Sequence, residues 1–358
     1  MGRDARVDAA VTNWAPRFVA NGVPYPDFAD VTRDLERWDD WCAAWSERAA
    51  IHEALGREAL DAGAGRTAGE HLVRAAVEYH FAKYLFVDHL DEMHAAHARA
   101  VACHRLALEH LDPPAERVEI PFEGTTLVGN LRRPRHAGDR PVPIVIMAMG
   151  LDSAKEEMGT NETPFLDRGM ATFAFDGPGQ GEGERDLVIR PDYEGPVAAV
   201  IDHLATRPDL DADRIGLWGV SLGGYYAPRA AAFESRVAAC IALSGPYDFG
   251  AAWDGLPGLT RSAFTVRSGA SAERDARERA GRLSLAGVAE RVTCPLLVIS
   301  GDRDRLFGVE QPQRLAVEAA GPTSHWRIED GNHVVNNRPY RYRSQSADWM
   351  AARLGVTG

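Results

Sequence analysis

The sequence predicts an α/β fold in which a mostly parallel sheet is flanked by helices and preceded by an all-helical N-terminal domain. Three observations predict it. Residues 31–111 are rich in Ala, Glu, Arg and Leu and contain almost no Pro, a composition typical of helices. Beyond the Pro-Pro pair at 113–114, short apolar runs alternate with helical patterns. The length of 358 residues suits two unequal domains, which we place at residues 1–113 and 114–358.

Apolar residues repeat at helical spacing in the N-terminal domain. Trp38, Trp41 and Trp45 form one apolar stripe at three- and four-residue intervals. Residues 61–67 contain two glycines and predict a turn between two helices, with Thr67 as the cap of the second.

The C-terminal domain contains apolar runs of strand length. A hairpin is expected first, from residues 118–122 and 126–131. The later strand candidates are residues 143–149, 171–176, 215–218, 237–244, 295–300 and 325–328. Residues 247–285 do not fit the strand–helix alternation, and two interpretations stay open: a cap-like insertion, or a solvated amphipathic helix without a functional role.

Composition excludes several classes of protein. The net charge of −12 argues against nucleic-acid binding, which needs clustered Lys and Arg. The N-terminus lacks the apolar core of a signal peptide, and no apolar run approaches the ~20 residues that cross a bilayer. The four cysteines are scattered and form no C-x-x-C pair, which favours buried thiols in a reducing cytoplasm. His94 and His97 share a helix face but His89 does not, so no metal site is expected.

Ser221 is the predicted nucleophile. It lies in the sequence Gly-Val-Ser-Leu-Gly at 219–223, after a strand candidate and before a helical run. A serine on such a sharp strand-to-helix turn projects its hydroxyl above the sheet, and the flanking glycines allow strand and helix to approach closely. The alternative is a glycine-rich loop that holds phosphate. That alternative is weakened because neither G-x-x-x-x-G-K-[ST] nor G-x-G-x-x-G occurs at the first strand–helix loop. The motif in this context predicts an α/β-hydrolase fold.

A serine hydroxyl needs a base, and in this fold the chain order is Ser, acid, His. Of the two histidines after Ser221, His325 lies within a strand pattern and is expected to be structural. His333 follows the last strand in a turn-rich loop and is the predicted base.

The acid that orients the base has three candidates. We predict Asp304, because the loop after residues 295–300 must leave the sheet before it turns toward His333. Asp302, in the same loop, and Asp248, after the preceding strand, stay open as alternatives. Two backbone N–H groups should form an oxyanion hole: that of Leu222, directly after the nucleophile, and that of Leu151, in the loop after residues 143–149.

Several blocks of sequence resemble a known family. They are MGLDSAKEE at 149–157, FDGPGQGE at 175–182, GVSLGG at 219–224 and YHFAKY at 79–84. Together they resemble the α/β hydrolases that include 2,6-dihydroxypseudooxynicotine hydrolase and the fungal polyketide-shortening hydrolases of pigment pathways. The resemblance spans most of the chain, from about residue 31 to the end.

The resemblance implies an α/β-hydrolase core with an N-terminal helical domain that helps to cover the active site, in a homodimer. It implies hydrolysis of a carbon–carbon bond beside a ketone in a small-molecule substrate, with no metal and no organic cofactor. It also supports Ser221, Asp304 and His333 as the catalytic residues. The segment after Asp248 matches this family poorly.

Weaker expectations concern the substrate. Tyr79, Tyr84, Tyr225 and Trp253 are candidates for substrate contacts, although aromatic stripes on helices are more often ordinary packing. Within hydrolases the rival activity is that of a carboxylesterase or thioesterase. A non-hydrolytic cyclase or binding protein on the same fold is a further alternative, and it would need a broken triad.

Overall fold

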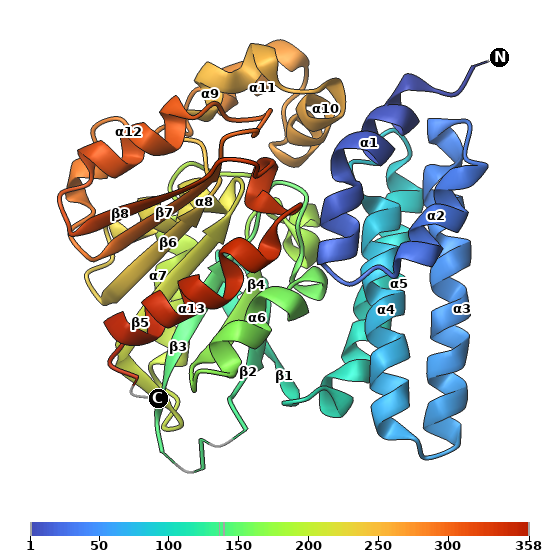
Figure 1. Cartoon of the computed structure of the whole chain (residues 1–358), viewed down its shortest axis with the longest axis horizontal. Helices are drawn as coiled ribbons and strands as arrows, with labels where there is room; N and C mark the ends of the chain where they lie inside the picture. Colours follow the sequence, from blue (N-terminus) through green and yellow to red (C-terminus); the bar gives the residue numbers. More distant parts are fainter. Residues whose placement is uncertain (1, 136, 139, 357–358) are drawn as a thin grey trace. The chain divides into compact units, whose positions relative to one another are not determined.

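The computed structural model describes residues 2–135, 137–138 and 140–356. The chain divides into two compact units. The helical unit comprises residues 1–117 together with residues 156–160, and the sheet unit comprises residues 118–155 and 161–358. The helices of the first unit, and the parallel sheet with flanking helices of the second, confirm the predicted fold class (Figure 1).

The helical unit consists of five α-helices and two short 3-10 turns among its described residues. The helices are α1 (Ala5–Ala20), α2 (Tyr25–Arg33), α3 (Trp41–Asp61), α4 (Gly65–Lys83) and α5 (Leu90–Ala107). The turn between α3 and α4 is shorter than expected, because Gly63 adopts a φ of +71° that ends α3 and the next helix starts two residues later. The prediction that Thr67 caps this helix is wrong: Thr67 lies inside α4, and Ala64 is at the cap position.

Aromatic rings form the core of the helical unit. Phe18 of α1 stacks on Phe81 of α4 at 3.8 Å between ring centroids, and Trp45 of α3 lies 5.2 Å from Phe18. Trp38 and Trp41 stack at 5.0 Å, and all five side chains are buried. The tryptophan stripe therefore packs α3 against the neighbouring helices, as helical spacing predicts.

The sheet unit is built on eight strands in the order β1-β2-β4-β3-β5-β6-β7-β8. The strands are β1 (Ala115–Phe122), β2 (Thr125–Arg132), β3 (Val142–Ala148), β4 (Ala171–Asp176), β5 (Leu210–Val220), β6 (Val237–Leu243), β7 (Leu296–Gly301) and β8 (Thr323–Ile328). Strand β2 pairs antiparallel with β4, whereas β4, β3, β5, β6, β7 and β8 pair parallel with their neighbours. Strands β3, β4 and β7 are buried along their whole length, as is typical of parallel strands covered on both faces.

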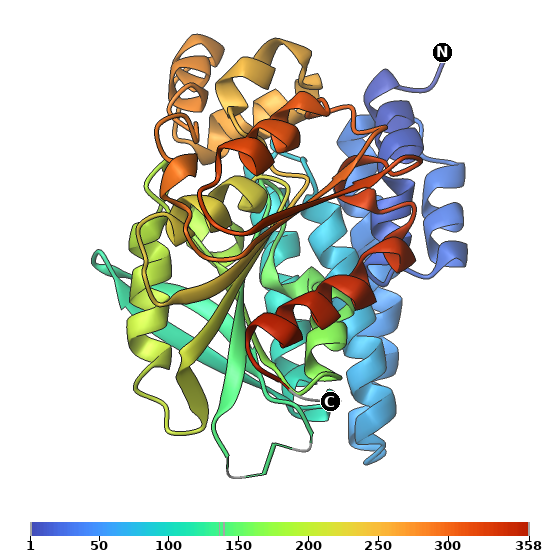
Figure 2. The ribbon, with the colours of Figure 1, turned by 60° about the vertical axis from the view of Figure 1, so that its left-hand side comes forward.

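Helices cover both faces of this sheet. They are α6 (Gly159–Leu166), α7 (Glu194–Leu204), α8 (Gly223–Ala231), α12 (Glu310–Glu318) and α13 (Arg343–Arg353). Figures 1 and 2 show α6 and α13 on one face and α7 and α8 on the other. Residues 247–285 form α9 (Phe249–Ala252), α10 (Gly258–Arg267) and α11 (Glu273–Ala280), and lie between β6 and β7 in the chain. No helix among the residues described in the structure combines the length and apolarity needed to cross a bilayer.

The strand order places a topological switch beside β3. From β3 the chain passes to β4 on one side, and β5 then pairs with the other side of β3. The helices that follow β3 and β5, α6 and α8, consequently lie on opposite faces of the sheet (Figure 2). Loops that diverge in this way leave a crevice at the carboxyl ends of the strands, which is where α/β folds bind ligands.

Candidate active site

Ser221 lies at the carboxyl end of β5, on the sharp turn into α8. Its φ of +55° is in the left-handed region, where a residue with a side chain is strained and where such strain often accompanies function. The turn is tight because a Cβ at Gly219 would lie 1.9 Å from the carbonyl oxygen of Gly223, and one at Gly223 would lie 2.1 Å from that of Ala148. Only glycine fits at these two positions.

His333 lies between Ser221 and Asp304. Its Nε2 lies 2.8 Å from Oγ of Ser221, and its Nδ1 lies 2.8 Å from Oδ2 of Asp304. With Nδ1 carrying the ring proton, the imidazole donates to Asp304 and leaves Nε2 to accept the serine proton. The structure therefore brings together the three side chains that the sequence places far apart in the chain.

Asp304 is itself held in place by the backbone. Its Oδ1 accepts hydrogen bonds from the N–H groups of Leu306 at 2.8 Å and Phe307 at 3.2 Å. The competing acids are engaged elsewhere. Asp302 forms a two-pronged ion pair with Arg327 at 3.0 and 3.1 Å, and Asp248 caps α9 through the N–H of Ala251.

The loop that carries His333 is hydrogen-bonded to the residue that follows β6. The hydroxyl of Ser244, at the end of β6, accepts a hydrogen bond of 3.0 Å from the N–H of Val334. Ser244, Val334 and Val335 all have positive φ values, so the backbone on both sides of this bond is strained, as at Ser221. The other late histidine, His325, has the expected structural position: its Nε2 lies 2.9 Å from the hydroxyl of Ser300.

The two predicted oxyanion donors lie at the ends of β3 and β5. Leu222 is at the N-cap position of α8, where backbone N–H groups have no partner within the helix. Neither its N–H nor that of Leu151 is donated to a protein acceptor within the part of the chain that the structure describes. A Cβ added to Gly150 would lie 3.1 Å from Cβ of Ser221, so the loop after β3 approaches the nucleophile closely.

Gln180 holds the loop after β3 through its side chain, and the sequence did not predict this role. Its side-chain amide donates to the carbonyls of Met149 at 2.7 Å and Gly150 at 2.8 Å. Its Oε1 accepts from the N–H of Gly177 at 3.2 Å and from the hydroxyl of Tyr193 at 3.0 Å. Gln180 is fully buried, and its four hydrogen bonds hold the loop after β3 against the loop after β4.

A buried charged cluster joins the same two loops. Nζ of Lys155 lies 2.7 Å from both Oδ2 of Asp176 and Oε1 of Glu182. Oδ1 of Asp176 also accepts from the backbone N–H of Lys155 at 2.9 Å. Lys155 belongs to the first of the family-like blocks, and Asp176, Gln180 and Glu182 to the second. The one lysine of the first block and the two acidic residues of the second were the signal that could have predicted their contact.

The segment 247–285 contacts the same site from α10. Arg267 is buried and donates from Nη1 to the carbonyl oxygen of Leu151. This hydrogen bond also holds the loop after β3, at Leu151, whose N–H is one of the two expected oxyanion donors.

A chain of aromatic rings runs from the same segment to the base. The ring of Phe307 lies 5.5 Å from that of His333, edge-on. Phe249 lies 6.0 Å from Phe307 and stacks on Phe264 at 4.9 Å. The segment 247–285 thus packs against Phe307, the ring next to the imidazole. It is not a solvated helix throughout, although α11 carries the expected charged run.

The four residues proposed for substrate contact lie in different surroundings. Tyr79 donates its hydroxyl to Glu53 at 3.0 Å within the helical unit. Tyr84 is buried in the aromatic core of the same unit, 5.4 Å from Phe18.

In the sheet unit, Tyr225 donates to the carbonyl of Pro191 at 2.8 Å. Trp253 is buried against Phe264 at 5.6 Å, one ring beyond the aromatic chain that reaches His333. A role in substrate binding stays a prediction for all four.

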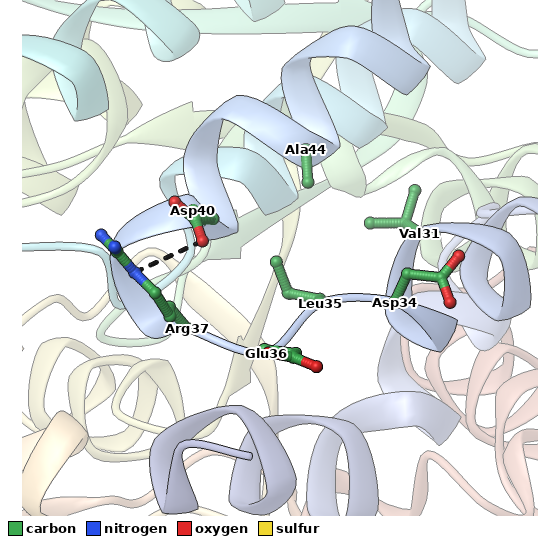
Figure 3. Close-up of a pocket in the computed structure, with 7 residues that line it drawn as sticks. All are labelled: Val31, Asp34, Leu35, Glu36, Arg37, Asp40 and Ala44. Atoms are coloured by element: carbon green, nitrogen blue, oxygen red, sulfur yellow. Dashed lines mark ion pairs between the residues drawn. The ribbon is translucent and has the colours of Figure 1, made fainter. Parts of the chain in front are cut away.

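A separate hollow of about 370 Å³ lies in the helical unit (Figure 3). Asp34, Glu36, Arg37 and Asp40 line its rim and are exposed, and Arg37 pairs with Asp40 at 3.5 Å. Val31, Leu35 and Ala44 supply its apolar surface. None of these seven residues is a serine, a cysteine or a histidine, so the hollow has no counterpart of the arrangement around Ser221.

Comparison with known proteins identifies the family of the chain. The model of the esterase FrsA-like family matches residues 33–248, and that of the prolyl oligopeptidase family matches residues 158–357. Each match covers more than half of the chain. The chain belongs to the FrsA-like esterase family of α/β hydrolases. It is therefore an enzyme of the hydrolase class, and the predicted family resemblance is confirmed.

Individual relatives of this α/β hydrolase span bacteria and fungi. The chain is 35% identical over 344 residues to 2,6-dihydropseudooxynicotine hydrolase of Paenarthrobacter nicotinovorans, covering 94% of this chain and 90% of that protein. It is 34% identical over 222 residues to 20-hydroxy-prefusarin hydrolase FUS2 of Gibberella moniliformis, covering 59% of this chain but only 53% of that protein.

The fold of this hydrolase also matches a solved structure over 96% of its length. The crystal structure of 2,6-dihydroxy-pseudo-oxynicotine hydrolase superimposes with a TM-score of 0.88 at 34% identity, covering 96% of each chain. The N-terminal helices and the sheet unit are therefore both part of the shared architecture.

Proposed function

We propose that this enzyme hydrolyses a carbon–carbon bond adjacent to a ketone, through an acyl-enzyme on Ser221. The single observation that carries the proposal is the position of His333, whose two ring nitrogens each lie 2.8 Å from an oxygen, one of Ser221 and one of Asp304. This is the arrangement of a nucleophile, a base and an orienting acid.

The chemistry follows from these positions. His333 accepts the proton of Ser221 as Oγ attacks the ketone carbon, and Asp304 stabilises the imidazolium that forms. The N–H groups of Leu151 and Leu222 donate to the tetrahedral oxyanion, which carries charge that the ground state lacks. Collapse breaks the carbon–carbon bond, and the leaving carbon takes the proton from His333. Water then attacks the acyl-enzyme with His333 again as base, and releases a carboxylic acid.

A leaving carbanion must be stabilised by conjugation. A β-dicarbonyl leaves as an enolate, and an acylated phenol ring leaves as a delocalised ring carbanion equivalent, so we propose an aryl or polyketide-like ketone as the substrate class. The relative with 35% identity over 94% of the chain, named for a pseudooxynicotine substrate, supports this choice. The fungal relative named for prefusarin supports a polyketide-like substrate more weakly, because the match covers about half of that protein.

The second candidate is an esterase, because the family model that matches residues 33–248 is named for an esterase. An ester needs the same nucleophile, base and oxyanion hole, and differs only in expelling an alkoxide. Geometry around Ser221 serves both reactions equally.

A matched pair of substrates separates the two candidates. We would compare a β-diketone or acylphenol with an ester of the same shape, and measure kcat/KM for both. Carbon–carbon hydrolysis predicts that the ketone is cleaved to an acid and a ketone or arene, and that Ser221→Ala removes this activity. If only the ester is turned over, the enzyme is an esterase. If Ser221→Ala leaves cleavage of the ketone intact, the acyl-enzyme mechanism is wrong. The homodimer implied by the family resemblance stays a prediction.

A further inference from the structure

Three acid and imidazole side chains meet in the helical unit, outside the site around Ser221. They are Asp27 of α2, His52 of α3 and Glu78 of α4. Nε2 of His52 lies 3.0 Å from Oδ2 of Asp27 and 3.7 Å from Oε1 of Glu78. One ligand atom from each of the three lies within 4.8 Å of the other two.

Glu78 is the observation that points to a ligand. Its side chain is 0% exposed, and neither carboxylate oxygen accepts a hydrogen bond from any residue that the structure describes. A buried carboxylate normally has hydrogen-bond donors or a cation beside it, because its transfer out of water is otherwise very unfavourable. Nε2 of His52, 3.7 Å from Oε1 of Glu78, can itself bind a metal.

We propose that Asp27, His52 and Glu78 form a binding site for a divalent transition metal of the zinc class, completed by water. Zinc is held at ~2.0–2.2 Å by histidine nitrogen and carboxylate oxygen, so two ligand atoms of a tetrahedral site lie ~3.3–3.6 Å apart. The separations of 3.0 and 3.7 Å on either side of His52 Nε2 bracket this spacing. Two carboxylates neutralise the charge of the dication, and the side chains of His52 and Asp27, 13% and 15% exposed, leave a side open to water.

The residues around the three ligands fit the same site. Nδ1 of His52 lies 3.2 Å from Nδ1 of His71. His71 precedes Glu78 by seven residues, or about two turns, on the same face of α4. When Nε2 of His52 binds the metal, its ring proton sits on Nδ1 and is donated to His71, the outer contact that metal-bound histidines usually make. Arg48 holds the other oxygen of Asp27 at 3.2 Å and so leaves Oδ2 for the metal.

Sequence spacing could not predict this site. Its ligands come one from each of three helices, and no two share the i, i+3 or i, i+4 spacing that marks a metal site on one helix. The histidines that do have helical spacing, on α5, led to the expectation of no metal site. The packing of α3 against α4 brings His52 to Glu78, and only the structure shows that contact.

The test is direct metal binding to the full-length protein after treatment with a chelator and dialysis. Co²⁺ is the probe, because its visible absorption reports coordination by protein side chains, and Zn²⁺ is the competitor. We expect about one equivalent of Co²⁺ to bind and to be displaced by Zn²⁺. Glu78→Gln, which keeps the shape of the side chain, and His52→Ala should weaken binding by at least ~100-fold, and His71→Ala by ~10–100-fold.

The matched control is His89→Ala. His89 also lies beside an aspartate, Asp39 at 3.7 Å, in the same unit, but both side chains are about half exposed. This variant should bind Co²⁺ as the unaltered protein does. Circular dichroism of each variant checks its fold, and Zn²⁺ should raise the Tm of the unaltered protein but not that of Glu78→Gln.

Two results would overturn the proposal. One is the absence of Co²⁺ and Zn²⁺ binding to the folded protein at micromolar metal, which would make the cluster a purely structural contact between an imidazole and two carboxyl groups. The other is binding that Glu78→Gln and His52→Ala leave unchanged, which would place the metal elsewhere, for example on His333.

Discussion

The side-chain amide of Gln180 donates a hydrogen bond of 2.8 Å to the carbonyl oxygen of Gly150. The peptide that joins Gly150 to Leu151 is planar and trans, so its carbonyl and its N–H point in opposite directions. Holding the carbonyl therefore also holds the direction of the Leu151 N–H, one of the two proposed oxyanion donors. Gln180 is a positioning residue in this scheme, because it acts on the reacting atoms only through the backbone.

Gln180→Glu tests this relationship. The carboxylate keeps the shape of the side chain but puts an oxygen where the amide donates to the carbonyls of Met149 and Gly150. We expect kcat to fall on the order of 10²-fold, as for loss of an oxyanion donor, with little change in KM. Affinity for a trifluoromethyl ketone, which forms the oxyanion on Ser221, should fall in parallel with kcat.

The control for this experiment is Tyr193→Phe. It removes only the hydroxyl that donates to Oε1 of Gln180, and should lower kcat by about fivefold or less. If Gln180→Glu lowers the Tm but leaves kcat and inhibitor affinity unchanged, the glutamine stabilises the loop without aligning the oxyanion hole.

Asp304→Asn should lower kcat by roughly 10⁴-fold, because an amide opposite Nδ1 favours the wrong tautomer of His333. The amide retains a carbonyl oxygen for the N–H groups of Leu306 and Phe307, so the loop should keep its structure. Asp302→Asn is the matched control, since it removes a carboxylate from the same loop but one that pairs with Arg327 at the surface. Steady-state kinetics on one substrate should separate the two variants. A larger loss in Asp302→Asn would mean that the acid was wrongly assigned.

The sequence predicted the sheet well, and it predicted that Ser221, Asp304 and His333 would lie together, for a physical reason. Buried parallel strands need continuous apolar runs. Strand β4 therefore has the predicted bounds, residues 171–176. Strand β5 contains the predicted residues 215–218 but begins earlier, at Leu210. The turn at Ser221 needs glycine at 219 and 223, because a Cβ at either position would collide with backbone atoms. These requirements are local, and local requirements leave a pattern in the chain.

What the sequence did not predict depends on contacts between distant residues. Gln180 is one polar residue in a glycine-rich turn, and nothing within that turn shows that its amide meets the carbonyl of Gly150. Arg267 lies among several arginines of residues 247–285, and only packing buries this one against Leu151. The helices α1 and α2 were also not predicted as separate elements, because the composition typical of helices begins only near residue 31.

Thiol reagents should leave the enzyme active. Burial raises the pKa of Cys42 to about 11, of Cys294 to about 11, of Cys103 to about 12 and of Cys240 well above its usual value. Since the thiolate is the reactive form, iodoacetamide at pH 7.5 should alkylate these thiols slowly and preserve activity. A fluorophosphonate should instead inactivate the enzyme and add one label, found by mass spectrometry on Ser221 and absent from Ser221→Ala. Inactivation by iodoacetamide at a comparable rate would implicate a cysteine in the reaction.

Acid should destabilise the helical unit through Glu157. This carboxylate is 1% exposed and lies 2.6 Å from Nη2 of Arg17 and 2.9 Å from Nδ2 of Asn21. Burial alone would raise its pKa, but the charges of Arg17 and His80 outweigh that effect and hold the pKa well below its ordinary value of 4.5. Because the unfolded chain binds this proton more readily than the folded one, the stabilisation is complete above pH ~5 and is lost as the pH falls below ~4.

Glu157→Gln isolates this contribution. At pH 7 the variant leaves Arg17 buried without its carboxylate, so the free energy of unfolding should fall by about 3–5 kcal/mol. Between pH 5 and pH 2.5 the dependence of that free energy on pH should be shallower than in the unaltered protein, because one proton-linked group has been removed. Urea titrations followed by circular dichroism at 222 nm measure both quantities. The control is Glu70→Gln, which breaks an exposed ion pair with Arg66 on α4 and should change neither the free energy of unfolding nor its pH dependence appreciably. If the Glu157→Gln variant and the unaltered protein show equal pH dependence, Glu157 does not determine the loss of stability in acid.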